Sequence, residues 1–248
     1  MFTHLQCIAL RRTPVSDSRV LLNVWSRQAG PLTLAFPAGS GREARRRRAL
    51  CGPMAIFEGA ADVRPGREVV SMRDFMPLPG SVALAAPDVP RDMVAAFLAE
   101  LLSALLRRSS PDADLSDYLF AGATRLGSAT CSPATFHLEF LAGLTAPMGI
   151  APDLSAAGPG MIFDMREACF RPSMPLHRDV LEGDDAAYFA ALVRAYNNIM
   201  PGADGSPEAL AAPRDRRMRT LQGLLDYYAI HLGALPPLKS LEVLRGLF

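Results

Sequence analysis

The first third of the chain alternates between apolar and polar residues with the period of two that is typical of β-strands. Short runs of β-favouring residues occur in five places, at residues 7–10, 20–25, 32–36, 54–57 and 68–72. Residues that favour turns separate these runs. Five short strands at this spacing predict a small closed barrel, because closure removes sheet edges that would otherwise pair with other chains. A five-stranded OB-fold β-barrel fits this length.

A proline-rich segment, residues 77–90, ends the strand pattern. After it the apolar residues recur with the helical period of about 3.6. Helices are predicted at residues 93–106, 114–126, 133–146, 185–198, 215–232 and 240–248, with a short strand or hairpin at 161–170. The chain is therefore predicted to be an α+β multidomain protein. Residues 1–80 form the OB-fold nucleic-acid-binding domain, and residues 81–248 form an α-helical bundle domain.

Charge divides along the same boundary. The 248 residues carry a net charge of only +1, and half of them are apolar, as in a globular protein. Residues 1–80, however, hold twelve arginines and six acids, a net charge of +6. Residues 81–248 hold fourteen basic and nineteen acidic residues, a net charge of −5. The basic portion is a candidate for contact with a phosphate backbone.

Residues 39–50 concentrate this positive charge, with five arginines and one acid. We interpret them as a mobile, glycine-flanked loop between the third and fourth strands. Guanidinium groups match phosphate oxygens, so the segment favours a polyanion as partner, and the alternative is a solvated loop. Trp25 is a candidate for stacking on bases, or a core residue. The predicted DNA-binding residues are Arg11, Arg12, Trp25, Arg27, Arg42, Arg45, Arg46, Arg47, Arg48, Arg64, Arg67 and Arg73.

A second group of cations, at residues 214–219, begins the predicted helix 215–232. Positive charge at the start of a helix opposes the helix dipole. Either a neighbouring acidic helix or DNA would remove this cost, and the acidic helix is the simpler explanation.

No motif for catalysis or metal binding is present. The cysteines at 7, 51, 131 and 169 are too far apart for a zinc ribbon or a redox pair. There is no phosphate-binding loop, dinucleotide fingerprint or nucleophile elbow. His137 and Glu139 have the spacing found in zinc deaminases, but the accompanying cysteine pair is missing, which favours an ordinary helix surface. No apolar run is long enough for a membrane span or a signal peptide, so we expect a cytoplasmic protein without cofactor or metal.

Several short motifs occur in a fixed order along the chain. They begin with residues 6–10, 16–18 and 25–27, followed by the arginine segment. The helical part contributes residues 136–141 and 163–167, and residues 238–244 form the most specific motif. In this order the motifs resemble the RecO family of bacterial recombination mediators, and the resemblance covers most of the chain.

The resemblance implies a protein without a catalytic site that works in DNA repair. It implies binding of single- and double-stranded DNA and annealing of complementary strands. It also implies that the protein works with RecR to load RecA onto strands coated by single-strand-binding protein, in the cytoplasm at the nucleoid. A stand-alone OB-fold protein that binds RNA or DNA is the alternative, and an unrecognised enzyme comes third.

This chain departs from the family pattern in two places. Many members carry a four-cysteine zinc module near residues 150–180, where this chain keeps only Cys169, so the module is degenerate and zinc is not expected. The family's pocket for the acidic tail of single-strand-binding protein uses basic residues, but residues 133–147 contain neither Arg nor Lys. The pocket therefore cannot be transferred residue by residue, and Arg107 and Arg125 stay open as candidates.

Overall fold

The computed structural model describes residues 2–16, 19–37, 39, 41–64, 69–195 and 211–247. The chain forms two compact units. The first comprises Met1–Cys131 and Leu238–Leu244, and the second comprises Ser132–Pro237 and Arg245–Phe248.

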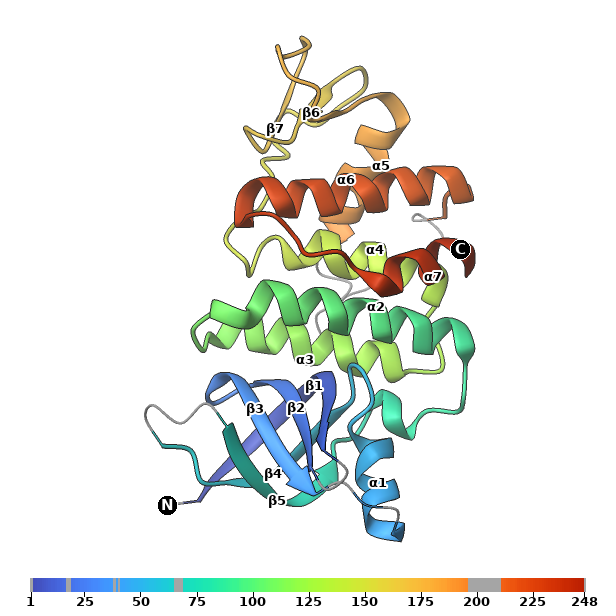
Figure 1. Ribbon diagram of the computed structural model, residues 1–248. Coiled ribbons are helices and arrows are strands. Elements are labelled where there is room, and N and C mark those ends of the chain that lie inside the picture. Colours follow the sequence, from blue (N-terminus) through green and yellow to red (C-terminus); the bar gives the residue numbers. More distant parts are fainter. Residues whose placement is uncertain are drawn as a thin grey trace. The chain divides into compact units, whose positions relative to one another are not determined.

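The first unit contains a closed barrel of five strands in the order β1-β2-β3-β5-β4 (Figure 1). The strands are β1 (Thr3–Ser16), β2 (Arg19–Ser26), β3 (Gly30–Pro37), β4 (Ile56–Ala61) and β5 (Val69–Pro77). β3 and β5 pair in parallel, and the other neighbours are antiparallel. This arrangement confirms the predicted OB-type barrel. The first strand is much longer than its apolar core predicted, because its exposed half pairs with β2 in a hairpin.

Alternate residues of the strands fill the barrel, as the period of two requires. Leu5, Cys7 and Ala9 of β1 point inward and are fully buried. Phe57 stacks on Phe75 with ring centroids 5.3 Å apart. The barrel interior is thus a packed apolar core, and ligands must bind on its outside.

The arginine segment is a helix, so its prediction as a mobile loop was wrong. α1 (Arg42–Leu50) connects β3 and β4, as Figure 1 shows. Arginine, alanine and leucine all favour helices, and the glycines that suggested a loop lie outside the helix. Arg47 and Arg48 occupy the last turn, where positive charge suits the helix dipole.

Two helices pack beside the barrel in the same unit. α2 (Val89–Leu105) contacts β1, and α3 (Ala113–Gly127) contacts β4. Short 3-10 helices, η1 (Val82–Leu84) and η2 (Leu106–Arg108), precede α2 and follow it. Asp88 and Asp112 each accept a hydrogen bond from a backbone N–H in the first helical turn, which fixes where α2 and α3 begin. Both predicted helices are confirmed.

The carboxylate of Glu100 on α2 caps α7 (Lys239–Leu247). It accepts hydrogen bonds from the backbone N–H groups of Lys239 and Ser240 and from the Ser240 hydroxyl. Burial raises the pKa of Glu100, but these hydrogen bonds outweigh it and leave the pKa below its usual value. The first turn of α7 is thereby fastened to the unit that contains the barrel.

The second unit consists of α4 (Pro133–Leu144), α5 (Gly183–Arg194), α6 (Arg214–Leu232) and a small sheet. The sheet has the order β7-β6-β8, from β6 (Ile162–Asp164), β7 (Cys169–Arg171) and β8 (Val180–Leu181). Phe163 stacks on Phe189 at 4.5 Å, and the Tyr228 hydroxyl donates to the carbonyl of Leu141 at 2.8 Å. The predicted hairpin and the three helices are confirmed, although residues 196–210 lie outside the described part.

The barrel strands end at Pro77, close to the predicted domain boundary at residue 80. The compact unit that contains them continues through α2 and α3 to Cys131. Within the described ranges, no helix is long and apolar enough to cross a membrane.

Candidate nucleic-acid interface

The α1 arginine face consists of Arg42, Arg45 and Arg46. These positions follow the spacing i, i+3 and i+4, so they lie on one side of the helix. All three are exposed, and their side chains form no hydrogen bond or ion pair with another residue that the structure describes. Like charges one turn apart repel each other. A phosphate chain that binds this face would relieve the repulsion.

The other two arginines of α1 are only partly exposed. Arg48 donates to the carbonyl oxygen of Gly39 at 2.9 Å, which joins the helix to the segment before it. Burial raises the pKa of the Cys51 thiol to about 12, although the charges of Arg12 and Arg47 oppose this shift. The positive charges of Arg12 on β1 and of Arg47 on α1 therefore both act on Cys51, the residue that follows α1.

The remaining predicted arginines divide by their surroundings. Arg27 pairs with Asp117 of α3 and lies 4.5 Å from the centroid of the Phe120 ring, so it joins α3 to the barrel. Arg64 pairs with Asp62 at 2.7 Å. Arg11 is exposed on β1, and Arg67 lies outside the described residues. The charges of Arg12 and Arg47 thus act on the same residue at the end of α1. Arg27 and Arg64 form ion pairs with aspartates.

Trp25 does not present a surface for base stacking. Its side chain is fully buried, and its Nε1 donates to the hydroxyl of Ser116 at 3.0 Å. The side chain of Trp25 points out of the barrel, where α3 covers it. Trp25 is therefore a buried residue, as the alternative interpretation of the sequence held, and it is no longer a candidate for contact with DNA bases.

We expect Trp25→Phe to reduce stability without changing DNA affinity. The change leaves Ser116 without its buried donor and opens a small cavity, at a cost of about 2 kcal/mol. Thermal unfolding measures the first effect, and fluorescence anisotropy with a labelled single strand measures the second. In the unaltered protein, quenching of the single tryptophan by added DNA would contradict the buried position.

Phe2 is a candidate contact that the sequence pattern does not indicate. Its ring is about half exposed, at 53%, and the guanidinium of Arg73 lies 5.1 Å from its centroid. An exposed aromatic ring beside an arginine is the combination that binds single-stranded bases by stacking. No signal in the sequence separates Phe2 from an ordinary core phenylalanine, because the exposure follows from its place just before β1.

Two of the four arginines that begin α6 are paired with acids of α5. Arg216 contacts Asp184 at 2.5 Å, and Arg219 binds Asp185 through two hydrogen bonds of 2.6 and 3.0 Å. The hydrogen bond and charge of Asp185 raise the pKa of Arg219. The neighbouring acidic helix is therefore the correct explanation for Arg216 and Arg219, whereas Arg214 and Arg217 donate to the carbonyl oxygens of Arg245 and Ala212.

Comparison with known proteins decides the family. The sequence model described as "Recombination protein O C terminal" matches residues 87–242, which is more than half of the chain. The chain belongs to the RecO family. The resemblance that the short motifs indicated is thereby confirmed.

Similarity to RecO proteins extends over almost the whole chain. The DNA repair protein RecO of Porphyromonas gingivalis is 28% identical over an alignment of 250 positions, which covers 98% of each chain. The DNA repair protein RecO of Phocaeicola vulgatus is 29% identical over 247 residues, or 97% of each chain. That of Anaeromyxobacter dehalogenans is 27% identical over 240 residues, or 91% of this chain and 90% of the other. The barrel and the helices are therefore both included in the similarity.

The residues of this chain do not fit the zinc module that the resemblance implies for many members of the family. A structural zinc site takes four thiolate or imidazole ligands, and Cys169 is the one thiol in residues 150–180. Among the residues that the structure describes, no group of three or more His, Cys, Asp or Glu is arranged to hold a metal.

A buried carboxylate occupies this region instead. Asp164, at the end of β6, is fully buried and accepts hydrogen bonds from the backbone N–H groups of Arg166 and Glu167. Arg171 of β7 donates to it at 2.9 Å, and Nε2 of His177 lies 3.3 Å away. Burial raises the pKa of Asp164, but these hydrogen bonds and the charge of His177 outweigh it, so the pKa lies below its usual value. We call these four contacts the Asp164 cluster.

Proposed function

We propose that this chain is a non-enzymatic recombination mediator in DNA repair that binds single- and double-stranded DNA and anneals complementary strands. The observation that carries the proposal is the α1 arginine face, three exposed cations on an OB-type barrel in a chain of the RecO family. Contacts from arginine to phosphate are independent of sequence and release counterions. They suit a protein that must bind whatever strand is present.

Charge neutralisation also explains how such a surface would promote annealing. Two strands repel each other through their phosphates, and a surface that neutralises part of that charge lowers the cost of bringing them together. Arg12, Arg47 and the α1 arginine face place several cations in one region of the barrel. Binding alone supplies this effect, so the proposal requires no nucleotide hydrolysis.

The proposal extends to protein partners. We infer that the chain works with RecR, contacts the C-terminal tail of single-strand-binding protein and thereby helps to load RecA, in the cytoplasm at the nucleoid. Membership of the RecO family supports this extension. The family match includes the helices, which a bare OB-fold binding module would not need.

We expect the protein to accelerate annealing of complementary strands coated with single-strand-binding protein, without added nucleotide. The measurement follows fluorescence energy transfer between dyes on the two strands, with single-strand-binding protein alone as the control. A protein that binds single strands but leaves the coated strands to anneal at the control rate would be a stand-alone binding module, and the mediator proposal would fail. Acceleration that requires nucleotide turnover would favour an enzyme instead.

A further inference from the structure

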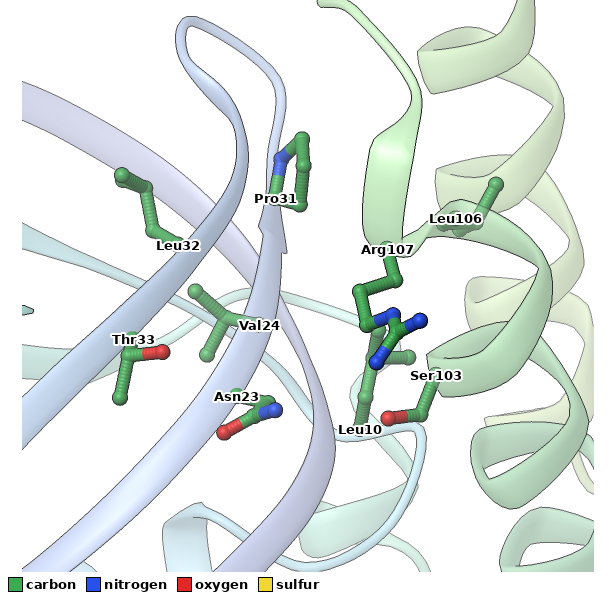
Figure 2. A pocket seen from close by; sticks show the side chains of 9 residues that line it. All are labelled: Leu10, Asn23, Val24, Pro31, Leu32, Thr33, Ser103, Leu106 and Arg107. Carbon is green, nitrogen blue, oxygen red and sulfur yellow. The ribbon is translucent and has the colours of Figure 1, made fainter. Parts of the chain in front are cut away.

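A groove lies on the outer surface of the barrel where β2 and β3 face the end of α2 and η2. Its volume is about 410 Å³. Figure 2 shows the residues of β2 and β3 on one side and Ser103, Leu106 and Arg107 on the other. All of its lining residues belong to the same compact unit. The lining residues are Leu10, Asn23, Val24, Pro31, Leu32, Thr33, Ser103, Leu106 and Arg107.

Four polar side chains of the groove have no partner within the described part of the chain. These are Asn23, Thr33, Ser103 and Arg107, none of which makes a side-chain hydrogen bond or ion pair with another described residue. An amide both donates and accepts, a hydroxyl does the same, and a guanidinium offers several donors. The groove therefore presents hydrogen-bonding groups of both kinds that are free to bind a ligand.

The charge and the apolar surface of the groove indicate which class of ligand it could bind. Arg107 is the one charged residue of the lining, and no carboxylate accompanies it. Its guanidinium suits a phosphate. Pro31 and Leu32, the partly exposed apolar residues of the lining, supply surface of the kind that packs against a flat ring. A ligand that combines one negative charge, a flat ring and a hydrogen-bonding edge is a nucleotide.

The position and size of the groove agree with this ligand. OB-fold barrels bind oligonucleotides on the face of strands 2 and 3, and the groove includes residues of both β2 and β3. Its volume lies within the range of pockets that hold small molecules. In a duplex the base edge is paired and the ring is stacked, so only an unpaired nucleotide could enter.

We propose that this groove is a subsite for one unpaired nucleotide of a DNA strand, with Arg107 on its phosphate and Asn23 and Thr33 on the edge of its base. The inference rests on the proposed DNA binding and adds a means to distinguish single strands from duplexes. The α1 arginine face binds both forms through phosphates, whereas the groove contributes only when a base is free.

Two variants test the groove, Arg107→Ala and the double change Asn23→Ala with Thr33→Ala. The matched control is Arg108→Ala, which removes the same charge from an exposed neighbour that does not line the groove. Fluorescence anisotropy with a labelled single strand and a labelled duplex of equal length, at one salt concentration, gives the affinities. We expect single-strand affinity to fall about fivefold in each groove variant, and duplex affinity to stay within about twofold. The control should stay within about twofold for both.

Other outcomes would overturn the proposal. If the groove variants lost equal affinity for single strand and duplex, or if Arg108→Ala had the same effect as Arg107→Ala, then Arg107 would act only through its positive charge. If a peptide rich in Asp and Glu displaced the single strand from the unaltered protein but not from Arg107→Ala, the groove would be a peptide site. If the groove variants bind as the parent does while alanine at Arg42, Arg45 and Arg46 weakens binding, only the groove is refuted. Absence of any DNA binding by the parent would refute the proposed function as well.

Discussion

Replacing Arg42, Arg45 and Arg46 together with alanine should lower the affinity for DNA roughly thirtyfold, and equally for single strands and duplexes of any sequence. Three exposed phosphate contacts contribute about 2 kcal/mol in total, which corresponds to that factor. The slope of log affinity against log salt for single strands should also become shallower by about 2, because each lost contact removes roughly 0.7. Fluorescence anisotropy at several salt concentrations measures both quantities.

The matched control removes three positive charges elsewhere. Arg108, Arg178 and Arg194 are exposed and form no ion pair with any described residue, so their replacement by alanine changes the net charge equally. We expect a much smaller change of affinity and of salt slope in this control. If both triple variants behave alike, the α1 arginine face would be an ordinary solvated surface and total charge alone would govern binding.

Where periodicity is strong, the sequence predicted the fold well. The strands were recognised because a barrel buries one side of each strand, which forces the period of two. The helix of residues 215–232 was recognised because one side is buried, with Leu221, Leu224 and Tyr228 fully enclosed. The charges at its start were also interpreted correctly, because helix dipoles make such a cluster costly without acids nearby.

Hydrophobic periodicity did not predict the helix α1. The segment carries few apolar residues, so no periodic stripe marks it as a helix, and its charge density suggested a loop. Its helical propensity was the better guide, since every residue from Arg42 to Leu50 is a good helix former. The correction affects function, because a helix places Arg42, Arg45 and Arg46 on one face and turns Arg47 and Arg48 partly inward.

Tertiary contacts explain the other errors. Trp25 lies on a strand face that would be open to solvent in an isolated barrel, and it is buried because α3 covers it. His137 and Glu139 were expected on a helix surface, but both are buried, because α4 has neighbours on more than one side. Burial lowers the pKa of His137 to about 4, so this side chain is neutral near pH 7. The groove around Arg107 joins residues more than eighty positions apart and leaves no local signal.

Asp164→Ala should destabilise the small sheet of the second unit by about 3 kcal/mol. The change leaves the guanidinium of Arg171 without its partner and removes the fully buried carboxylate that accepts from two backbone N–H groups. Native-state hydrogen exchange of the backbone N–H groups that pair β6 with β7 reports local opening of the hairpin. We expect this exchange to accelerate roughly a hundredfold, in proportion to the population of the opened state.

Asp179→Ala is the matched control, because Asp179 lies in the same region but pairs with Arg166 at the surface. Exposed pairs contribute little, so the cost should stay below about 1 kcal/mol. Since the pKa of Asp164 is lowered in the folded state, its contribution is present above the unfolded value near 4 and is lost as the pH falls through the folded value. Opening of the hairpin in the parent should therefore increase only in acid, measured as the loss of hydrogen-exchange protection relative to the intrinsic exchange rate at each pH, whereas Asp164→Ala should lack that step. A chelator should change neither protein. If the chelator opened the hairpin, a metal rather than the Asp164 cluster would hold it.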